Sequence, residues 1–183
     1  DLRAVVAEML ADVQQRSSLL AGGTSGHDGS FFIASDDTSF RLNVGGMIQA
    51  RYVADFRDDS DPDDFESGFQ VWRTELRFSG NVHANWLYFI EGEFDRDGGA
   101  FNLNDAYIGY KLNDRWTLVG GQVKAPALRE ESLHERFQLA VDRSITNSVF
   151  SQGRSHAVAA IYTDDTFQFI PVFSDGARSE DTD

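Results

Sequence analysis

The chain has 183 residues, a net charge of −14 and no cysteine. The negative charge argues against a nucleic-acid partner, because a phosphate backbone would repel the protein, and the missing cysteines exclude disulfides and thiolate metal sites. The sequence contains no apolar run of about 18 residues, so no transmembrane helix is expected, whereas its 15 Phe residues suit a lipid-facing band. Because it starts at Asp1 and ends in a polar stretch, we expect a fragment or a processed chain.

Residues 2–20 are predicted to form a helix. Its key positions follow a 4-3-4-3-4 spacing, interrupted once by an arginine: Leu2, Val6, Met9, Val13, Arg16 and Leu20. This spacing fits either a short coiled coil or an ordinary amphipathic helix. Residues 21–38 are predicted to be a glycine-rich linker, in which residues 31–33 form a short strand or a plug segment.

A long alternation runs from residue 40 to residue 56. The even positions are apolar or small, and those between are mostly polar; the even positions are Phe40, Leu42, Val44, Gly46, Ile48, Ala50, Tyr52, Ala54 and Phe56. Because side chains alternate between the two faces of a strand, this pattern predicts one strand with an oily face and a wet face. Soluble strands usually run about 3–10 residues, so a two-faced strand of about 17 residues suits a tilted crossing of an outer membrane. The oily face would meet lipid, and the wet face would meet a water-filled lumen.

Six further segments continue the alternation, at residues 69–80, 85–95, 103–112, 115–124, 155–163 and 166–174. In the first of these, Trp72 falls on the oily face. The phase of 115–124 is ambiguous, because Trp116 shares its parity with Gln122 and Lys124, and a bulge at residues 120–121 would resolve it. Pro171 fits an edge strand or a bulge. Seven strands cannot close a barrel with an even strand number, so further strands are expected beyond this chain.

The connections alternate between short and long. Short turns are predicted near residues 80–85, 113–114 and 163–165, and long loops at 58–67, 96–102 and 125–154, which is the layout of an outer-membrane barrel. The apolar residues of the third long loop need burial, which predicts that it folds inward against the wall; they are Leu133, Phe137, Leu139, Val141, Ile145, Val149 and Phe150. Five aromatic residues near strand ends predict interfacial girdles, namely Trp72, Trp86, Tyr88, Tyr110 and Trp116.

An ordered series of segments carries a resemblance to a known family. The segments are 29–35, 40–52, 73–80, 103–110, 120–126 and 139–144, among them Arg73-Thr74-Glu75-Leu76 and Gly120-Gly121-Gln122. Over residues 29–176 they resemble the phosphate-selective porin O and P family. The resemblance implies a trimeric outer-membrane β-barrel of about sixteen strands, with a third loop that narrows the pore. The expected fold is therefore all-β: an incomplete antiparallel transmembrane β-barrel over residues 39–183, with about seven of its strands present.

Charged residues on the wet faces are the candidate pore lining: Arg41, Arg51, Arg73, Glu75, Arg77, Glu91, Glu93, Lys111 and Lys124. They would set the field of the lumen, or form an ion-pair ladder between strands, or both. Charged residues of the third loop are the candidate constriction: Arg129, Glu130, Glu131, Arg136, Asp142 and Arg143. A phosphate channel of the family lines its constriction with basic groups, and the mixture of signs here argues against strict phosphate selectivity.

No catalytic residue, cofactor or metal site is predicted, since no two histidines share a helical spacing and no Gly-x-Ser-x-Gly turn occurs. The expected function is passive diffusion of small hydrophilic solutes or ions, phosphate and other inorganic anions among them, by a homotrimer in the outer-membrane lipid of a Gram-negative-type bacterium. Two alternatives stay open. One is a soluble ligand-binding β-barrel, and the other is a structural outer-membrane protein tethered through its N-terminal coiled coil.

Overall fold

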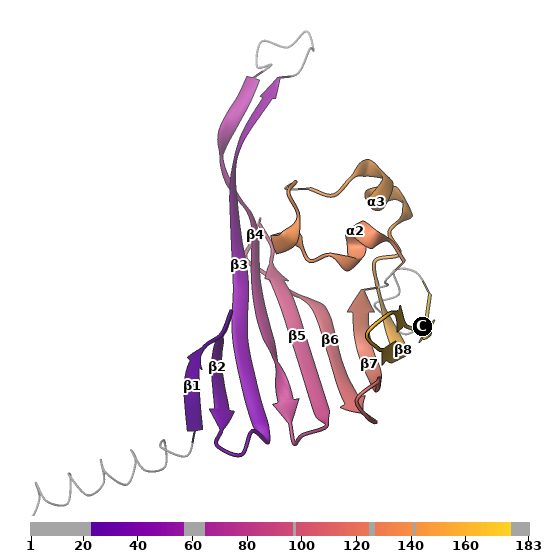
Figure 1. Cartoon of the computed structure of the whole chain (residues 1–183). Coiled ribbons are helices and arrows are strands. Elements are labelled where there is room, and N and C mark those ends of the chain that lie inside the picture. Colours follow the sequence, from indigo (N-terminus) through magenta and orange to yellow (C-terminus); the bar gives the residue numbers. More distant parts are fainter. Residues whose placement is uncertain (1–22, 57–64, 97, 125–126, 141, 177–183) are drawn as a thin grey trace, which may run out of the picture.

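A computed structural model describes residues 23–56, 65–96, 98–124, 127–140 and 142–176. The helix predicted at residues 2–20 lies outside this described part. The described strands form one antiparallel sheet in the order β1-β2-β3-β4-β5-β6-β7-β8-β10, with β9 also paired to β8. Figure 1 shows the strands side by side, with the segment after β7 crossing over one end of the sheet. Among the described residues no pairing joins β1 to β10, so closure of a barrel stays a prediction.

The elements are β1 (Gly23–His27), β2 (Phe31–Ser35), β3 (Phe40–Phe56), β4 (Phe65–Val82), β5 (Trp86–Phe94), β6 (Phe101–Lys111), β7 (Trp116–Lys124), α2 (Arg129–Ser132), the 3-10 turn η1 (Glu135–Phe137), α3 (Ile145–Phe150), β8 (Arg154–Thr163), β9 (Gln168–Phe169) and β10 (Val172–Ser174). Among the described helices, none is both long enough and apolar enough to cross a membrane.

The β3–β4 hairpin is the longest part of the sheet. The strand predicted at residues 40–56 is confirmed with the same bounds, and it pairs with β4 from Phe40–Val82 to Phe56–Phe65. Strand β5 pairs with β4 only as far as Glu75, and β2 pairs with β3 only as far as Val44. The far half of the hairpin therefore rises beyond the neighbouring described strands, as Figure 1 shows.

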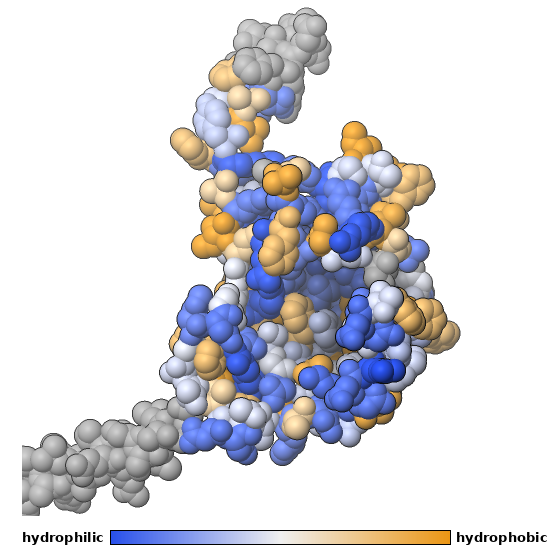
Figure 2. All heavy atoms as spheres, viewed as in Figure 1, coloured by the Kyte–Doolittle hydropathy of each residue, from blue (hydrophilic) through white to orange (hydrophobic). Residues whose placement is uncertain are grey.

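The two faces of the sheet have the polarity that the alternation predicts. On the oily face Ile48 is 76% exposed, Phe69 91% and Ile108 58%, whereas Glu75 and Glu91 on the wet face are each only 4% exposed. A soluble domain buries its large apolar side chains and exposes its charges. Here the arrangement is reversed, as a lipid-facing wall requires. In Figure 2 hydrophobic residues stand along the outline, and hydrophilic residues surround the central hollow.

Two predicted segments differ from the structure near the ends of the sheet. Residues 21–38, predicted as a linker, contain the hairpin of β1 and β2. Its glycines permit close packing, since a Cβ on Gly26 would lie 3.0 Å from the ring of Phe32. The single strand predicted at residues 166–174 is wrong. It is two short strands separated by Pro171, which has no N–H for a ladder.

The bulges also differ from those expected. No register shift occurs at Gly120-Gly121, because β7 pairs continuously with β8 from Trp116–Tyr162 to Lys124–Arg154. Instead β4 has a bulge, since Gln49 pairs with Arg73 and Ala50 with Val71. Trp72 is the extra residue, and its ring lies 3.1 Å from the guanidinium carbon of Arg51 and 3.9 Å from that of Arg96. The placement of Trp72 on the oily face near a strand end is therefore wrong.

Aromatic residues gather at the short-turn ends of the strands. Trp86 begins β5 and packs on Tyr110 with ring centroids 4.8 Å apart, and Trp116 begins β7 and packs on Tyr162 at 5.1 Å. Tyr88 donates a hydrogen bond to the carbonyl of Arg41 at 3.0 Å. Except for Trp72, the predicted girdle residues therefore do lie close to one rim, as amphipathic rings at a membrane interface would.

Candidate functional site

The segment between β7 and β8, residues 125–153, carries the site together with the wet face of the sheet. We call its described residues, 127–140 and 142–153, the docked loop. Polar contacts within the loop hold its shape: Glu130 accepts hydrogen bonds from the N–H of Ser144 at 2.7 Å and from its hydroxyl at 2.6 Å. Ser144 also caps α3 by accepting from the N–H of Asn147 at 3.1 Å. Ser151 donates to the buried Glu131 at 2.5 Å.

We call the wet face of strands β3 to β8 the wall. The first contact between the docked loop and the wall involves Asp142. Its carboxylate lies 3.1 Å from Nη1 of Arg51 on β3 and 3.9 Å from Nη2 of Arg73 on β4. Arg51 is held in place by Gln70, which accepts from its Nε at 3.0 Å, and by the ring of Trp72. Arg51 and Arg73 of the wall therefore share one carboxylate of the loop.

The second contact involves His134. Its Nε2 lies 3.1 Å from Glu91 on β5 and 3.6 Å from Glu75 on β4. Arg77 donates to Glu91 at 2.8 Å and also contacts Nε2 of His134. Ligand atoms of Glu75, Glu91 and His134 lie within 4.8 Å of one another. Among the described residues, these three could together hold a metal ion. The sequence predicted no metal site, because these residues lie on three separate elements.

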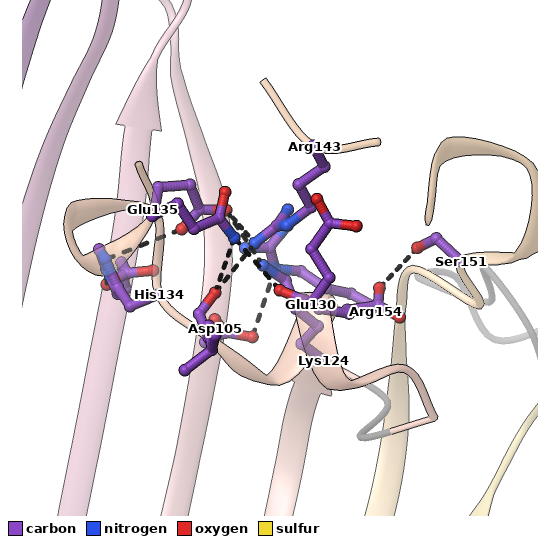
Figure 3. Close-up of polar contacts among 12 residues, drawn as sticks. Asp105, Lys124, Glu130, His134, Glu135, Arg143, Ser151 and Arg154 are labelled. Carbon is purple, nitrogen blue, oxygen red and sulfur yellow. Dashed lines mark hydrogen bonds and ion pairs between the residues drawn. The ribbon is translucent and has the colours of Figure 1, made fainter. Parts of the chain in front are cut away.

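The third contact joins Glu135 of the docked loop to Lys124, the last residue of β7, at 3.4 Å. Arg143 of the loop also pairs with Glu135, and Arg154 at the start of β8 pairs with Asp105 on β6 at 3.3 Å. Figure 3 shows these side chains converging from the loop and from three neighbouring strands. A cleft of about 510 Å³ between loop and wall is lined by Glu91, Asp105, Lys124, His134 and Glu135, among others.

Two carboxyl groups of the loop, those of Glu130 and Glu135, have a pKa below its ordinary value. The hydroxyl and then the backbone N–H of Ser144 lower the pKa of Glu130 from its ordinary value of 4.5. Burial acts to raise the pKa of Glu135, but the charge of Lys124, a backbone hydrogen bond and the charges of Arg143 and His134 outweigh it, so that pKa is lowered overall. At neutral pH Glu135 is therefore ionised where it meets Lys124 of the wall, and Glu130 is ionised where it holds Ser144 within the loop.

The structure brings together part of the predicted set. Arg51, Arg73 and Asp142 meet. Arg77 pairs with Glu91, and Glu75 and Glu91 both lie beside His134. Lys124 meets Arg143 through Glu135. Seven predicted residues stand apart from these contacts. Arg41 pairs with Asp28 at the other end of the sheet, Lys111 is exposed at the short-turn end of β6 and Arg129 is exposed on α2, while Glu130 and Glu131 bond within the loop. Glu93 lies opposite Glu75 on the neighbouring strand, and Arg136 lies over the ring of Phe137.

Burial of apolar side chains was predicted to fold the third long loop inward, and this part of the prediction is wrong. The loop does fold onto the wall, but its apolar side chains stay exposed: Phe137 66%, Leu139 107%, Ile145 84%, Val149 63% and Phe150 66%. Val141 lies outside the described residues. Charged and hydrogen-bonding groups, not apolar ones, make the described contacts with the wall. Docking of this loop is therefore an electrostatic event.

His134 and Glu135 belong to the site but were not predicted from the sequence. Neither belongs to a local motif, and His134 is 57 positions from Arg77 and 43 from Glu91. The available signal was indirect, since Arg77 and Glu91 were both assigned to a wet face that needed a partner from the loop.

Comparison with known families bears on what this wall and loop belong to. The family described as phosphate-selective porin O and P matches residues 42–183. No curated protein gives a significant match to the chain. The family match spans the sheet from β3 onward and the whole docked loop, so it covers the elements that carry the site. The chain therefore belongs to the phosphate-selective porin O and P family, a family of outer-membrane porins.

Proposed function

We propose that this chain supplies part of the wall and the constriction loop of a passive channel, through which small hydrophilic solutes and ions cross the outer membrane of a Gram-negative-type bacterium. The observation that carries the proposal is the docking of the loop onto the wet face through Asp142, His134 and Glu135. A loop held there stands in the path of a solute that moves along that face. The exposed oily face supports a position in lipid, and disfavours a soluble ligand-binding barrel.

We further propose that the channel discriminates weakly between anions and cations and is not selective for phosphate. A phosphate path needs basic groups that are free to bind the passing anion. Here basic groups of the wall and loop are engaged by carboxylates, in the pairs Arg51–Asp142, Arg77–Glu91, Lys124–Glu135, Arg143–Glu135 and Arg154–Asp105. Paired charges of opposite sign largely cancel at the distance of a hydrated ion.

The proposal is tested by recording the whole protein in planar lipid bilayers under a salt gradient. Asp142→Asn removes the carboxylate shared by Arg51 and Arg73, so the ratio of anion to cation permeability should rise by about twofold or more. Arg73→Glu should shift the ratio in the opposite direction. Asp164→Asn, in the short turn after β8, is the matched charge control and should leave it unchanged.

Two results would contradict this function. A wild-type protein that forms no channels would remove the proposed role altogether. Saturation of the wild-type current by millimolar phosphate, with no such effect of chloride, would instead establish phosphate selectivity and refute the weak discrimination proposed here.

A further inference from the structure

Glu75 lies in an unusual position on the wet face of β4. Its side chain is 4% exposed, and its Oε2 has no hydrogen-bond partner among the described residues. A buried carboxylate without a partner is costly, because the protein does not replace the water that solvates the charge. The nearest group of opposite character is Nε2 of His134, 3.6 Å away and on the docked loop.

The basic groups nearby are committed to other carboxylates. Arg77 bonds to Glu91 at 2.8 Å, while Lys124 and Arg143 pair with Glu135. Glu93, directly opposite Glu75 on β5, adds further negative charge. The cluster therefore has an acceptor oxygen in excess, aimed at the imidazole of the loop.

The donor atoms have the spacing and chemistry of a metal site. Bonds of about 2.0–2.1 Å in a tetrahedral zinc site place neighbouring ligand atoms about 3.3 Å apart. His134 Nε2 lies 3.1 Å from Glu91 Oε2 and 3.6 Å from Glu75 Oε2, and ligand atoms of all three residues lie within 4.8 Å of one another. One imidazole nitrogen with two carboxylates suits a borderline metal such as Zn²⁺ better than Ca²⁺.

We propose that Glu75, Glu91 and His134 bind one divalent transition-metal ion that ties the docked loop to the wall. The ion supplies the missing partner of Glu75 and holds the imidazole of His134 against β4 and β5. A remaining coordination position opens on the cleft that Glu91 and His134 both line, where water or a solute can occupy it. Arg77 is a competitor for this site, since its guanidinium contacts both Glu91 and His134 and must withdraw from the imidazole when the ion binds.

The first experiment measures binding of Zn²⁺ alone to the whole detergent-solubilised protein after removal of metal with EDTA. We expect about one ion per chain by calorimetry and elemental analysis, and Co²⁺ in its place should give the visible absorption of a four-coordinate site. His134→Gln and Glu75→Gln should each weaken Zn²⁺ binding at least tenfold. Arg77→Met should strengthen it severalfold, because a repelling cation is removed. His83→Gln, in the turn between β4 and β5, is the matched control and should bind like the wild type.

The outcomes separate cleanly. Wild-type protein that binds no Zn²⁺ at tens of micromolar, or binds it equally well with His134→Gln and Glu75→Gln, would overturn the site. Where one of these two variants fails to fold, the other still decides whether the ion binds at this cluster. The effect on the loop rests on the proposed function: micromolar Zn²⁺ should lower the single-channel current of the wild type and leave that of His134→Gln unchanged. A protein that binds Zn²⁺ but never conducts would refute the channel and leave the metal site standing.

Discussion

At the scale of single residues, the phase of a strand decides which medium a side chain meets. The alternation correctly assigned Arg51, Arg73, Glu75 and Glu91 to the wet face, because each position follows directly from period-2 geometry. Trp72 could not be assigned in this way. A bulge inserts one residue without a sequence signature, and an indole looks like a lipid-facing residue until the arginines on either side of it are placed.

Depth in the membrane should grade the cost of a charge on the oily face. Ile90 lies four residues from the girdle residue Trp86 on the same strand, about 13 Å along it, whereas Ile48 pairs with Thr74, level with the far end of β5. Ile90→Arg should therefore cost about 2–4 kcal/mol of folding free energy and Ile48→Arg about 0–1 kcal/mol. Urea titration of the whole protein in lipid vesicles measures both, with Ile90→Leu as the uncharged control. Equal losses from the two arginines would contradict the assigned depth.

At the scale of elements, the hydrophobic pattern predicts where the docked loop lies but not how it is attached. Its existence, its bounds and its contact with the wet face could be predicted, because a long insertion between two strands stands out in the sequence. Its mode of attachment could not. The partners Arg51 and Asp142 are 91 positions apart, and no local pattern specifies which of many charged residues will meet.

Acid should loosen the docked loop. The pKa of Glu130 is lowered in the folded loop, so its stabilising contribution is fully present above the ordinary value of 4.5 and is lost as the pH falls through the lowered folded value. The pKa of Glu135 is also lowered, so its stabilising contribution is lost in acid in the same way. Cleavage of the loop by pepsin should therefore accelerate below about pH 4 more than cleavage elsewhere. Glu130→Gln should be looser already at higher pH and show a smaller acid response. Loop cleavage in the wild type that rises in acid only as much as cleavage elsewhere would refute this.

At the scale of the whole molecule, the sheet leaves strand edges at β1 and at the β8–β10 side that have no described partner. In lipid such edges must be paired, so we expect further strands of the whole protein to close the barrel. The heptad-like spacing at residues 2–20, outside the described residues, leads us to expect that the N-terminus joins protomers of a trimer. Deleting residues 1–22 should leave the barrel foldable, as judged by heat-modifiable gel mobility, and should reduce the trimer on cross-linking. An unchanged cross-linking pattern would remove this role.

The long sequence separation of the loop contacts also sets an order of assembly. The sheet is built from hairpins, so each strand can add to the one before it with little chain to close. Arg51 and Asp142 are 91 positions apart, so their contact closes a much longer stretch of chain than any hairpin of the sheet does. We therefore expect the loop to dock last in forming this part of the molecule. In the proposed channel, a newly inserted barrel would then pass through a stage in which its lumen is still wide open, before the charge pairs of the loop make the channel narrower.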